Sequence, residues 1–225
     1  RDTGFECICL DLIYGLPNQT LQSFESTLQR IVEINPDRVR CFSYAHRPAS
    51  RPHQYAIESG LLPGPEEKLA LLHSAVRCFT DSGYSWIGVD CFAQSSDELA
   101  DAQAAGTLRH TCLGYTSAKT RHLVALGTSS LGEVDGAFLQ NESSQDAWVK
   151  AIADRRLPIR WGHKPSETDR RRHLAIQHLL CNLELPARLM SDLQGDHERL
   201  LRCAEHGLIE VNATFDFEFF GRRVP

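Results

Sequence analysis

The chain has 225 residues, a formal net charge of −5 and a hydrophobic content of 42%. A hydrophobic fraction of this size supports a folded core and excludes a wholly disordered chain. The acidic balance argues against a nucleic-acid-binding protein, and no apolar run is long enough to form a transmembrane helix. The eight cysteines show no spacing typical of a small disulfide-linked domain, so we expect reduced thiols in a cytoplasmic protein.

Predicted strands and helices alternate over the first 90 residues. The apolar run at 5–14 is typical of a buried parallel strand, and a second strand is expected at 38–44. Apolar residues at helical spacing predict helices at 21–34 and 65–81, and residues 84–89 predict a third strand. Because parallel neighbours need a crossover helix, this order predicts an α/β fold with a parallel sheet and right-handed crossovers.

The pattern changes after residue 90. We expect a short helix at 95–105, a Gly/Thr/Ser-rich loop at 106–120 and a strand at 134–140. Helices are expected at 143–153, 166–182 and 190–206, and a hairpin at 207–219. Helices followed by a hairpin indicate a winged-helix-like module. We therefore predict two domains, 1–135 and 136–225, the second mainly helical. Since the chain opens almost inside a strand, we expect it to be a piece of a longer protein.

Asp11 is the one acid in the centre of the first apolar strand. A buried carboxylate is costly unless it is paired or hydrogen-bonded. Asp11 is therefore either a site residue or a structural acid satisfied by a backbone amide. Other candidates follow strands, where the sites of parallel barrels gather; they are His46, Asp90 and Cys91. A lone histidine is more often structural than functional, and nothing in the sequence indicates a lowered pKa for Cys91.

Three further features carry weaker signals. The glycine-rich segments 114–116 and 127–132 allow close backbone approach to a ligand or simply form turns. Cys7 and Cys9 have no third cysteine nearby, so they predict no metal site. The arginines at 170, 171 and 172 are most simply a solvated helix face. These residues alone identify no catalytic group.

Six segments of the chain carry a resemblance to a known enzyme family. They are DLIYGLPNQT (11–20), INPDRVRCFSYAHRP (34–48), SGYSWIGVDCFA (82–93), DELADAQAAGTL (97–108), LGYTS (113–117) and LCNLEL (180–185). Their order and spacing, over about residues 5–185, resemble the bacterial oxygen-independent coproporphyrinogen III oxidases, also called dehydrogenases, of the radical S-adenosylmethionine superfamily. The resemblance implies half of a radical S-adenosylmethionine (β/α) barrel at 1–135, followed by the winged-helix-like C-terminal domain.

The resemblance also implies an activity and its cofactors. Enzymes of this family bind a [4Fe–4S] cluster and two molecules of S-adenosylmethionine, and they convert coproporphyrinogen III to protoporphyrinogen IX by oxidative decarboxylation of two propionates. On this template Asp11 and Ala45 contact the second S-adenosylmethionine and Leu131 contacts the first. The implied partner is a porphyrinogen substrate, with no nucleic acid and no membrane, and the implied state is a monomer.

Several departures from the family pattern bear on function. The cysteine motif that binds the cluster is absent, so we expect no metal ligands in this chain and no activity from it alone. Cys91 stands where the family has histidine, and His110 and Leu113 stand where it has arginine and glutamine. Arginine is the natural partner of a propionate. A paralogous radical enzyme with another substrate, a haem-binding or haem-chaperone relative and a non-catalytic remnant are therefore kept as alternatives.

Overall fold

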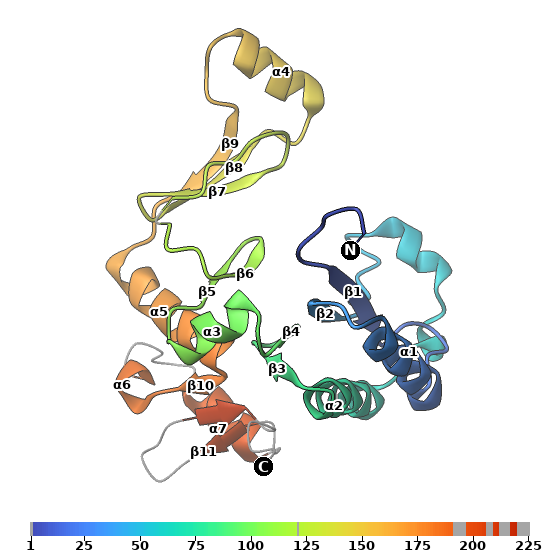
Figure 1. Cartoon of the computed structure of the whole chain (residues 1–225). Helices are drawn as coiled ribbons and strands as arrows, with labels where there is room; N and C mark the ends of the chain where they lie inside the picture. Colours follow the sequence, from blue (N-terminus) through green and yellow to red (C-terminus); the bar gives the residue numbers. More distant parts are fainter. Residues whose placement is uncertain (1, 121, 191–196, 206–208, 212–216, 220–225) are drawn as a thin grey trace. The chain divides into compact units, whose positions relative to one another are not determined.

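The computed structural model describes residues 2–120, 122–190, 197–205, 209–211 and 217–219 (Figure 1). The chain divides into two compact units, Arg1–Leu108 and Arg109–Pro225.

The first unit contains a four-stranded sheet and three α-helices. Its strands β1, β2, β3 and β4 are Cys9–Tyr14, Arg38–Ser43, Tyr84–Trp86 and Cys91–Gln94. Its helices α1, α2 and α3 are Leu21–Ile34, Pro65–Asp81 and Glu98–Ala104. Two short 3-10 helices, η1 and η2, lie between β2 and α2 at Pro52–Ala56 and Ser59–Leu61.

Capping residues set the ends of the first helix. The Thr20 hydroxyl accepts a hydrogen bond from the Ser23 amide, and the Ser23 hydroxyl accepts one from the Thr20 amide. Asn35 ends the helix in the left-handed conformation, at φ 53°. In α2, Pro65 occupies the first turn, where its missing N–H removes no helical bond. The predicted helices at 21–34 and 65–81 are therefore confirmed.

The sheet is only partly parallel. Its strand order is β1-β2-β4-β3, and β1 and β2 are parallel as predicted. The third strand ends at Trp86 rather than at residue 89, because the chain reverses and returns as β4, which pairs antiparallel with both β2 and β3. β3 thus runs in the same direction as β2 but is not its neighbour. The expectation of a wholly parallel sheet was wrong, because a four-residue strand after the turn gave no separate signal.

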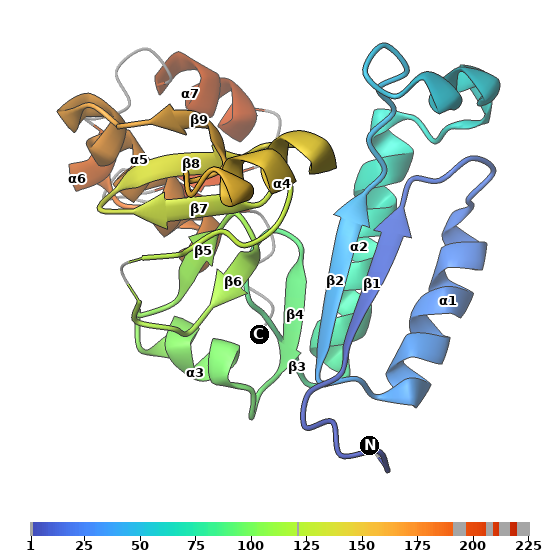
Figure 2. The same cartoon turned by 90° about the horizontal axis from the view of Figure 1, so that it is seen from above.

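One face of this sheet is covered by helices. Figure 2 shows α1 and α2 together on the same side of β1 and β2. The core between them includes Phe24 and Leu28 from α1, Phe79 from α2, and Val39 and Phe92 from the sheet. The alternate residues of β1, which are Cys9, Asp11 and Ile13, point to the opposite face and are exposed. We call this the open face of the sheet.

The described part of the second unit contains short strands and four helices. Strands β5 and β6 (Arg109–Thr111 and Gly114–Thr116) form a hairpin, and β7, β8 and β9 (Leu131–Val134, Ala137–Asn141 and Ile159–His163) form an antiparallel sheet. Helices α4 and α5 are Gln145–Ala153 and Glu167–Asn182. The remaining elements are β10 (Glu184–Leu185), α6 (Ala187–Met190), α7 (His197–Glu205), β11 (Ile209–Val211) and β12 (Phe217–Phe219).

Several predictions for this unit need correction. The segment 106–120 is not only a loop, since it contains the β5–β6 hairpin, and the single strand expected at 134–140 is two strands joined at a turn. Strand β9 was not predicted, because all five of its residues are exposed and no alternation marks it. Helices α4, α5 and α7 and the β11–β12 pairing are confirmed, whereas parts of the predicted last helix and hairpin, at 191–196, 206–208 and 212–216, lie outside the described residues.

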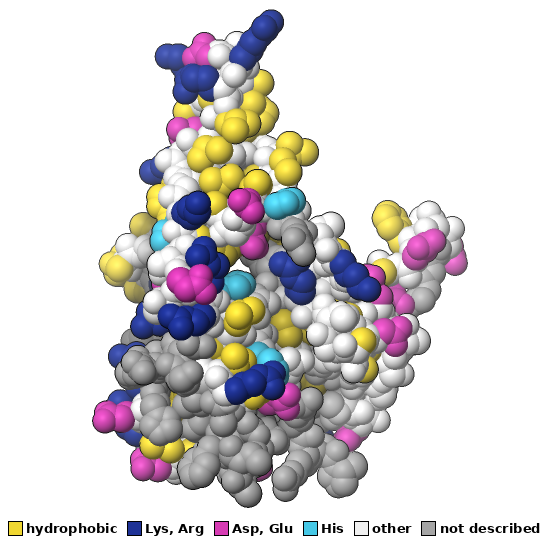
Figure 3. All heavy atoms as spheres, turned by 90° about the vertical axis from the view of Figure 1, so that its left-hand side faces the viewer, with side chains coloured by type: hydrophobic (Ala, Val, Ile, Leu, Met, Phe, Trp, Pro, Cys, Tyr) yellow, Lys and Arg dark blue, Asp and Glu magenta, His cyan; other side chains and the backbone are white. Residues whose placement is uncertain are grey.

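The described helices include none that is long and apolar enough to cross a membrane. On the face drawn in Figure 3, hydrophobic side chains gather in the upper part, which α4 and the β7–β9 sheet form. The exposed apolar residues of α4, of β9 and of the segment between them include Val149, Ile152, Leu157, Ile159 and Trp161. Lower on this face, basic and acidic side chains are interspersed.

Candidate functional site on the open face of the sheet

Asp11 forms an ion pair with Arg40 on the open face. The parallel register of β1 and β2 places the two residues directly side by side. Nε of Arg40 donates to Oδ1 of Asp11 at 2.8 Å, and Nη2 donates to Oδ2 at 3.0 Å. The Asp11 side chain is 51% exposed, so the expectation of a buried carboxylate was wrong. The apolar neighbours Cys9 and Ile13 are also on the open face, and they made the strand resemble one buried on both faces.

Arg40 is held on two sides. Its guanidinium carbon lies 5.7 Å from the centre of the Phe42 ring, within the range of a cation–π contact. The hydrogen bonds with Asp11 raise the pKa of Arg40, so the guanidinium is always charged. The Asp11 carboxylate has lone pairs beyond the two that Arg40 uses, and it can still accept a hydroxyl donor.

Ala45 and His46 follow the carboxyl end of β2. Ala45 lies five residues beyond Arg40, the strand neighbour of Asp11, and two residues beyond the end of β2. The buried side chain of Gln54 fixes this turn, since Nε2 donates to the Ala45 carbonyl at 3.1 Å and Oε1 accepts from the Arg47 amide at 2.5 Å. His46 is half-buried, and its Nδ1 has no hydrogen-bond partner among the described residues.

Asp90 and Cys91 are not at the end of a parallel strand. Asp90 lies in the turn before β4, where its carbonyl accepts from the Cys41 amide at 2.7 Å. Cys91 is the first residue of β4, beside Arg40 in the ladder. Burial raises the pKa of the Cys91 thiol to about 12, so it is a neutral, unreactive group at physiological pH.

Leu131 belongs to the second unit. It is the first residue of β7, pairs with Gln140 and is 41% exposed. Gly132 follows it, and a Cβ there would lie 2.8 Å from the carbonyl oxygen of Leu123. This glycine is therefore needed for backbone packing, and close approach of a ligand is not required to explain it.

The β5–β6 hairpin is fastened to α5. The His110 amide donates to Oε1 of Gln177 at 2.9 Å, and Nε2 of Gln177 donates to the His110 carbonyl at 2.6 Å. The Tyr115 hydroxyl donates to the Leu180 carbonyl at 3.0 Å. Leu113 is at the tip of the hairpin and 70% exposed. His110 and Leu113 are two of the three positions that depart from the family pattern, and they differ in setting: His110 is anchored to α5, and Leu113 is exposed.

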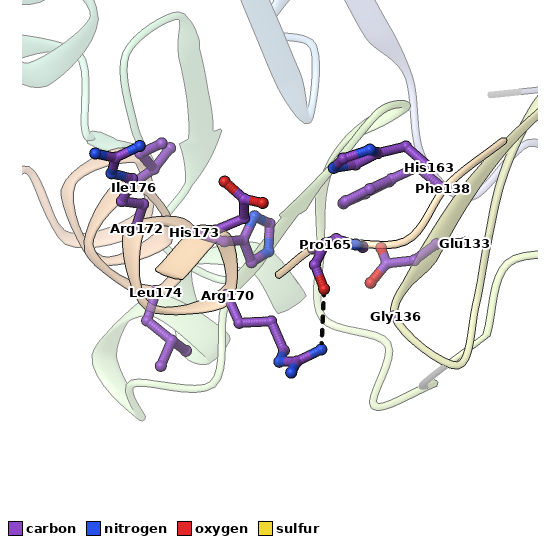
Figure 4. A pocket seen from close by; sticks show the side chains of 11 residues that line it. Glu133, Gly136, Phe138, His163, Pro165, Arg170, Arg172, His173, Leu174 and Ile176 are labelled. Atoms are coloured by element: carbon purple, nitrogen blue, oxygen red, sulfur yellow. Dashed lines mark hydrogen bonds between the residues drawn. The ribbon is translucent and has the colours of Figure 1, made fainter. Parts of the chain in front are cut away.

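A pocket of about 550 Å³ was missed by the sequence analysis. It lies between the β7–β9 sheet and the first turns of α5 (Figure 4), with Phe138 and His163 on the sheet side and His173 on the helix side. Arg170, which was expected to be solvated, donates to the Pro165 carbonyl at its edge and pairs with Glu167. The lining comes from four separate elements, so no local pattern could have indicated it.

The described residues include no group of three metal-ligating side chains. They therefore do not fit a [4Fe–4S] cluster, which needs three or four cysteine ligands. They fit part of S-adenosylmethionine, because Asp11 offers a carboxylate to hydroxyl groups and Arg40 offers N–H donors to an anion.

Comparison with known proteins gives close relatives. Oxygen-independent coproporphyrinogen III oxidase of Paracoccus denitrificans is 37% identical over 225 residues, which is 100% of this chain and 50% of the relative. The Escherichia coli protein of the same name is 35% identical over 221 residues, covering 94% of this chain and 48% of the relative. No protein-family model matches the chain.

A solved structure agrees with these relatives. Coproporphyrinogen III oxidase from Escherichia coli, described as a radical SAM enzyme, superposes with a TM-score of 0.80 at 32% identity, over 97% of this chain and 52% of that one. The α/β fold is therefore confirmed, and so is the resemblance predicted from the motifs. The chain spans about half the length of the curated relatives it matches, and over that half it is a relative of the oxygen-independent coproporphyrinogen III oxidases.

Proposed function

We propose that the whole protein of which this chain is a part converts coproporphyrinogen III to protoporphyrinogen IX without oxygen, as a radical S-adenosylmethionine enzyme of porphyrin biosynthesis. The observation that carries this proposal is the 35–37% identity to enzymes of that name along nearly the whole chain. We further propose a cytoplasmic monomer that acts on a porphyrinogen and binds neither nucleic acid nor membrane.

Two cofactors accompany this function. When bound, S-adenosylmethionine and a [4Fe–4S] cluster would supply the radical that removes hydrogen from the propionate side chains. We assign the cluster ligands to a part of the protein outside these 225 residues, and we expect this chain alone to be inactive. We assign Asp11 and Ala45 to the second of two S-adenosylmethionine molecules and Leu131 to the first, with Asp11 accepting hydroxyl hydrogen bonds.

The domain organisation is also a proposal. We divide the chain into part of the barrel at 1–135 and a winged-helix-like domain at 136–225; residues 135 and 136 lie in the β7–β8 turn. The order of α5, β10, α6, α7, β11 and β12 and the sheet order β10-β12-β11 support the winged-helix-like part.

Turnover by the full-length protein tests the function. The cluster would be rebuilt without oxygen, and the protein would be given S-adenosylmethionine, a reductant and coproporphyrinogen III. Protoporphyrin fluorescence after oxidation is the expected result. In the same protein, Asp11→Ala should weaken S-adenosylmethionine binding and leave the iron content unchanged; equal affinity in the variant would exclude the cofactor role of Asp11.

A second candidate function rests on the β5–β6 hairpin. His110 and Leu113 replace an arginine and a glutamine of the family pattern, which favours a paralogous radical enzyme or a haem-binding relative. Cleavage of S-adenosylmethionine without protoporphyrin formation would indicate the paralogue. Haem binding without S-adenosylmethionine consumption would indicate the haem-binding relative.

A further inference from the structure

The guanidinium of Arg40 is oriented before any ligand arrives. Asp11 takes the Nε and Nη2 donors at 2.8 and 3.0 Å, and the ring of Phe42 lies below at 5.7 Å. These two contacts, one from β1 and one from β2, fix the plane of the guanidinium and the edge that faces Asp11. Preorganisation of this kind reduces the entropy lost when a ligand binds.

Arg40 keeps donors available on its outer edge. A guanidinium has five N–H groups, and Asp11 accepts from two of them. In the described part of the chain, the other hydrogen-bond partner is the thiol of Cys9. Partial desolvation raises the pKa of that thiol, so it is neutral and does not compensate the positive charge. The side chain of Arg40 is 40% exposed, so a ligand can reach it.

The neighbouring Arg38 shows what a structural arginine does on the same face. Its Nε donates to Asp97 and its Nη2 to Glu98, both at 2.8 Å, and its side chain is only 21% exposed. These contacts tie β2 to the start of α3. The Asp11–Arg40 pair joins two strands that the ladder already holds together, and an ion pair this exposed contributes little to stability.

We propose that the outer edge of Arg40 binds a carboxylate of the ligand held at Asp11. This inference rests on the proposed function. A guanidinium edge with two parallel N–H groups matches the two oxygens of a carboxylate. The proposed reaction offers two sources of that chemistry, the aminocarboxylate of S-adenosylmethionine and the propionates of the porphyrinogen.

Ligand pairs that differ in their carboxylates test the proposal on the 225-residue chain. S-adenosylhomocysteine is compared with 5′-methylthioadenosine, which lacks the aminocarboxylate, by calorimetry. Coproporphyrin III is compared with its tetramethyl ester, by fluorescence quenching. The variants are Arg40→Gln, which removes the charge, and Arg40→Lys, which keeps the charge and loses the planar fork. Arg156→Gln is the matched control, because Arg156 forms an exposed pair with Asp154 at 3.2 Å.

Arg40→Gln should lower the affinity for one of the two carboxylate ligands, S-adenosylhomocysteine or coproporphyrin III, about 10- to 100-fold, as expected for a lost charge-assisted contact. Arg40→Lys should recover only part of that affinity. The carboxylate-free partner of that pair and the Arg156→Gln control should be unchanged. Loss confined to S-adenosylhomocysteine assigns the nucleotide carboxylate, and loss confined to coproporphyrin assigns a propionate. Circular dichroism of each variant checks the fold.

Three outcomes would overturn the proposal. They are equal losses for a carboxylate ligand and its carboxylate-free partner, wild-type affinity in Arg40→Gln, and no binding of either acid by the unchanged chain. The turnover assay separates this inference from the proposed function. If the full-length protein makes no protoporphyrin while Arg40→Gln still weakens the acid selectively, only the function fails. If protoporphyrin forms and the variant binds normally, only the inference fails.

Discussion

Replacing Gln177 by methionine should release the β5–β6 hairpin from α5. The side-chain amide makes two hydrogen bonds with the backbone of His110, at 2.9 and 2.6 Å, and both groups are partly buried. Methionine has a similar length and cannot replace either bond. Two lost bonds at about 1 kcal/mol each give about 2 kcal/mol, and local opening should become about 30-fold more frequent because each 1.4 kcal/mol is tenfold.

Amide hydrogen exchange of a peptide covering 109–116 measures this opening. Peptides from α1 and α2 should keep their protection, since the effect is local. Gln140→Met is the control, because the hydrogen bond of its side chain to the Ser129 carbonyl is long, at 3.4 Å. Unchanged exchange at 109–116 in Gln177→Met would show that Tyr115 and the flanking chain hold the hairpin without this amide, and the reasoning would be refuted.

Three further changes have expected outcomes. Asp97→Ala should destabilise the chain by about 2–4 kcal/mol in denaturant unfolding, because it removes the cap of α3 and leaves the guanidinium of Arg38 without its most buried partner. Gly132→Ala should cost about 1–3 kcal/mol in the same assay, since the new Cβ would lie 2.8 Å from the Leu123 carbonyl. Cys91 should resist alkylation in the folded chain, as mass spectrometry would show. Because the pKa of Cys91 is about 12 in the folded chain and 9.0 ordinarily, the thiol loses its proton more readily on unfolding, and the stability of the chain should fall as pH rises from 9 to 12.

The long helices could be predicted because their signals are local. Thr20 and Pro65 mark helix starts through hydrogen bonds and backbone geometry that involve only nearby residues. Strand order in the sheet depends on contacts between distant segments. β4 has only four residues and is almost wholly buried, so it shows neither alternation nor length, and its insertion between β2 and β3 could not be read from the sequence.

For the same reason, the sequence could indicate one residue of the candidate site but not the residue that pairs with it. Asp11 was a candidate because an acid interrupted an apolar run, which is a local signal. Its partner was not found, because pairing with Arg40 depends on the register of two strands separated by a helix. The burial of Asp11 was also mispredicted: Asp11 lies on the open face of the sheet, where the alternate residues of β1 are exposed although Cys9 and Ile13 are themselves apolar.

Arg38 and Arg40 show how one sheet face can combine structural and binding roles. They are two residues apart on β2, so strand geometry points both side chains to the same face. Arg38, which is nearer the start of the strand, donates to Asp97 and Glu98 at the beginning of α3, and its side chain is largely buried. The next one, Arg40, donates to the Asp11 carboxylate and to the Cys9 thiol and remains partly open to solvent. Changing Arg38 should therefore alter stability first, and changing Arg40 should alter ligand affinity while stability is nearly kept.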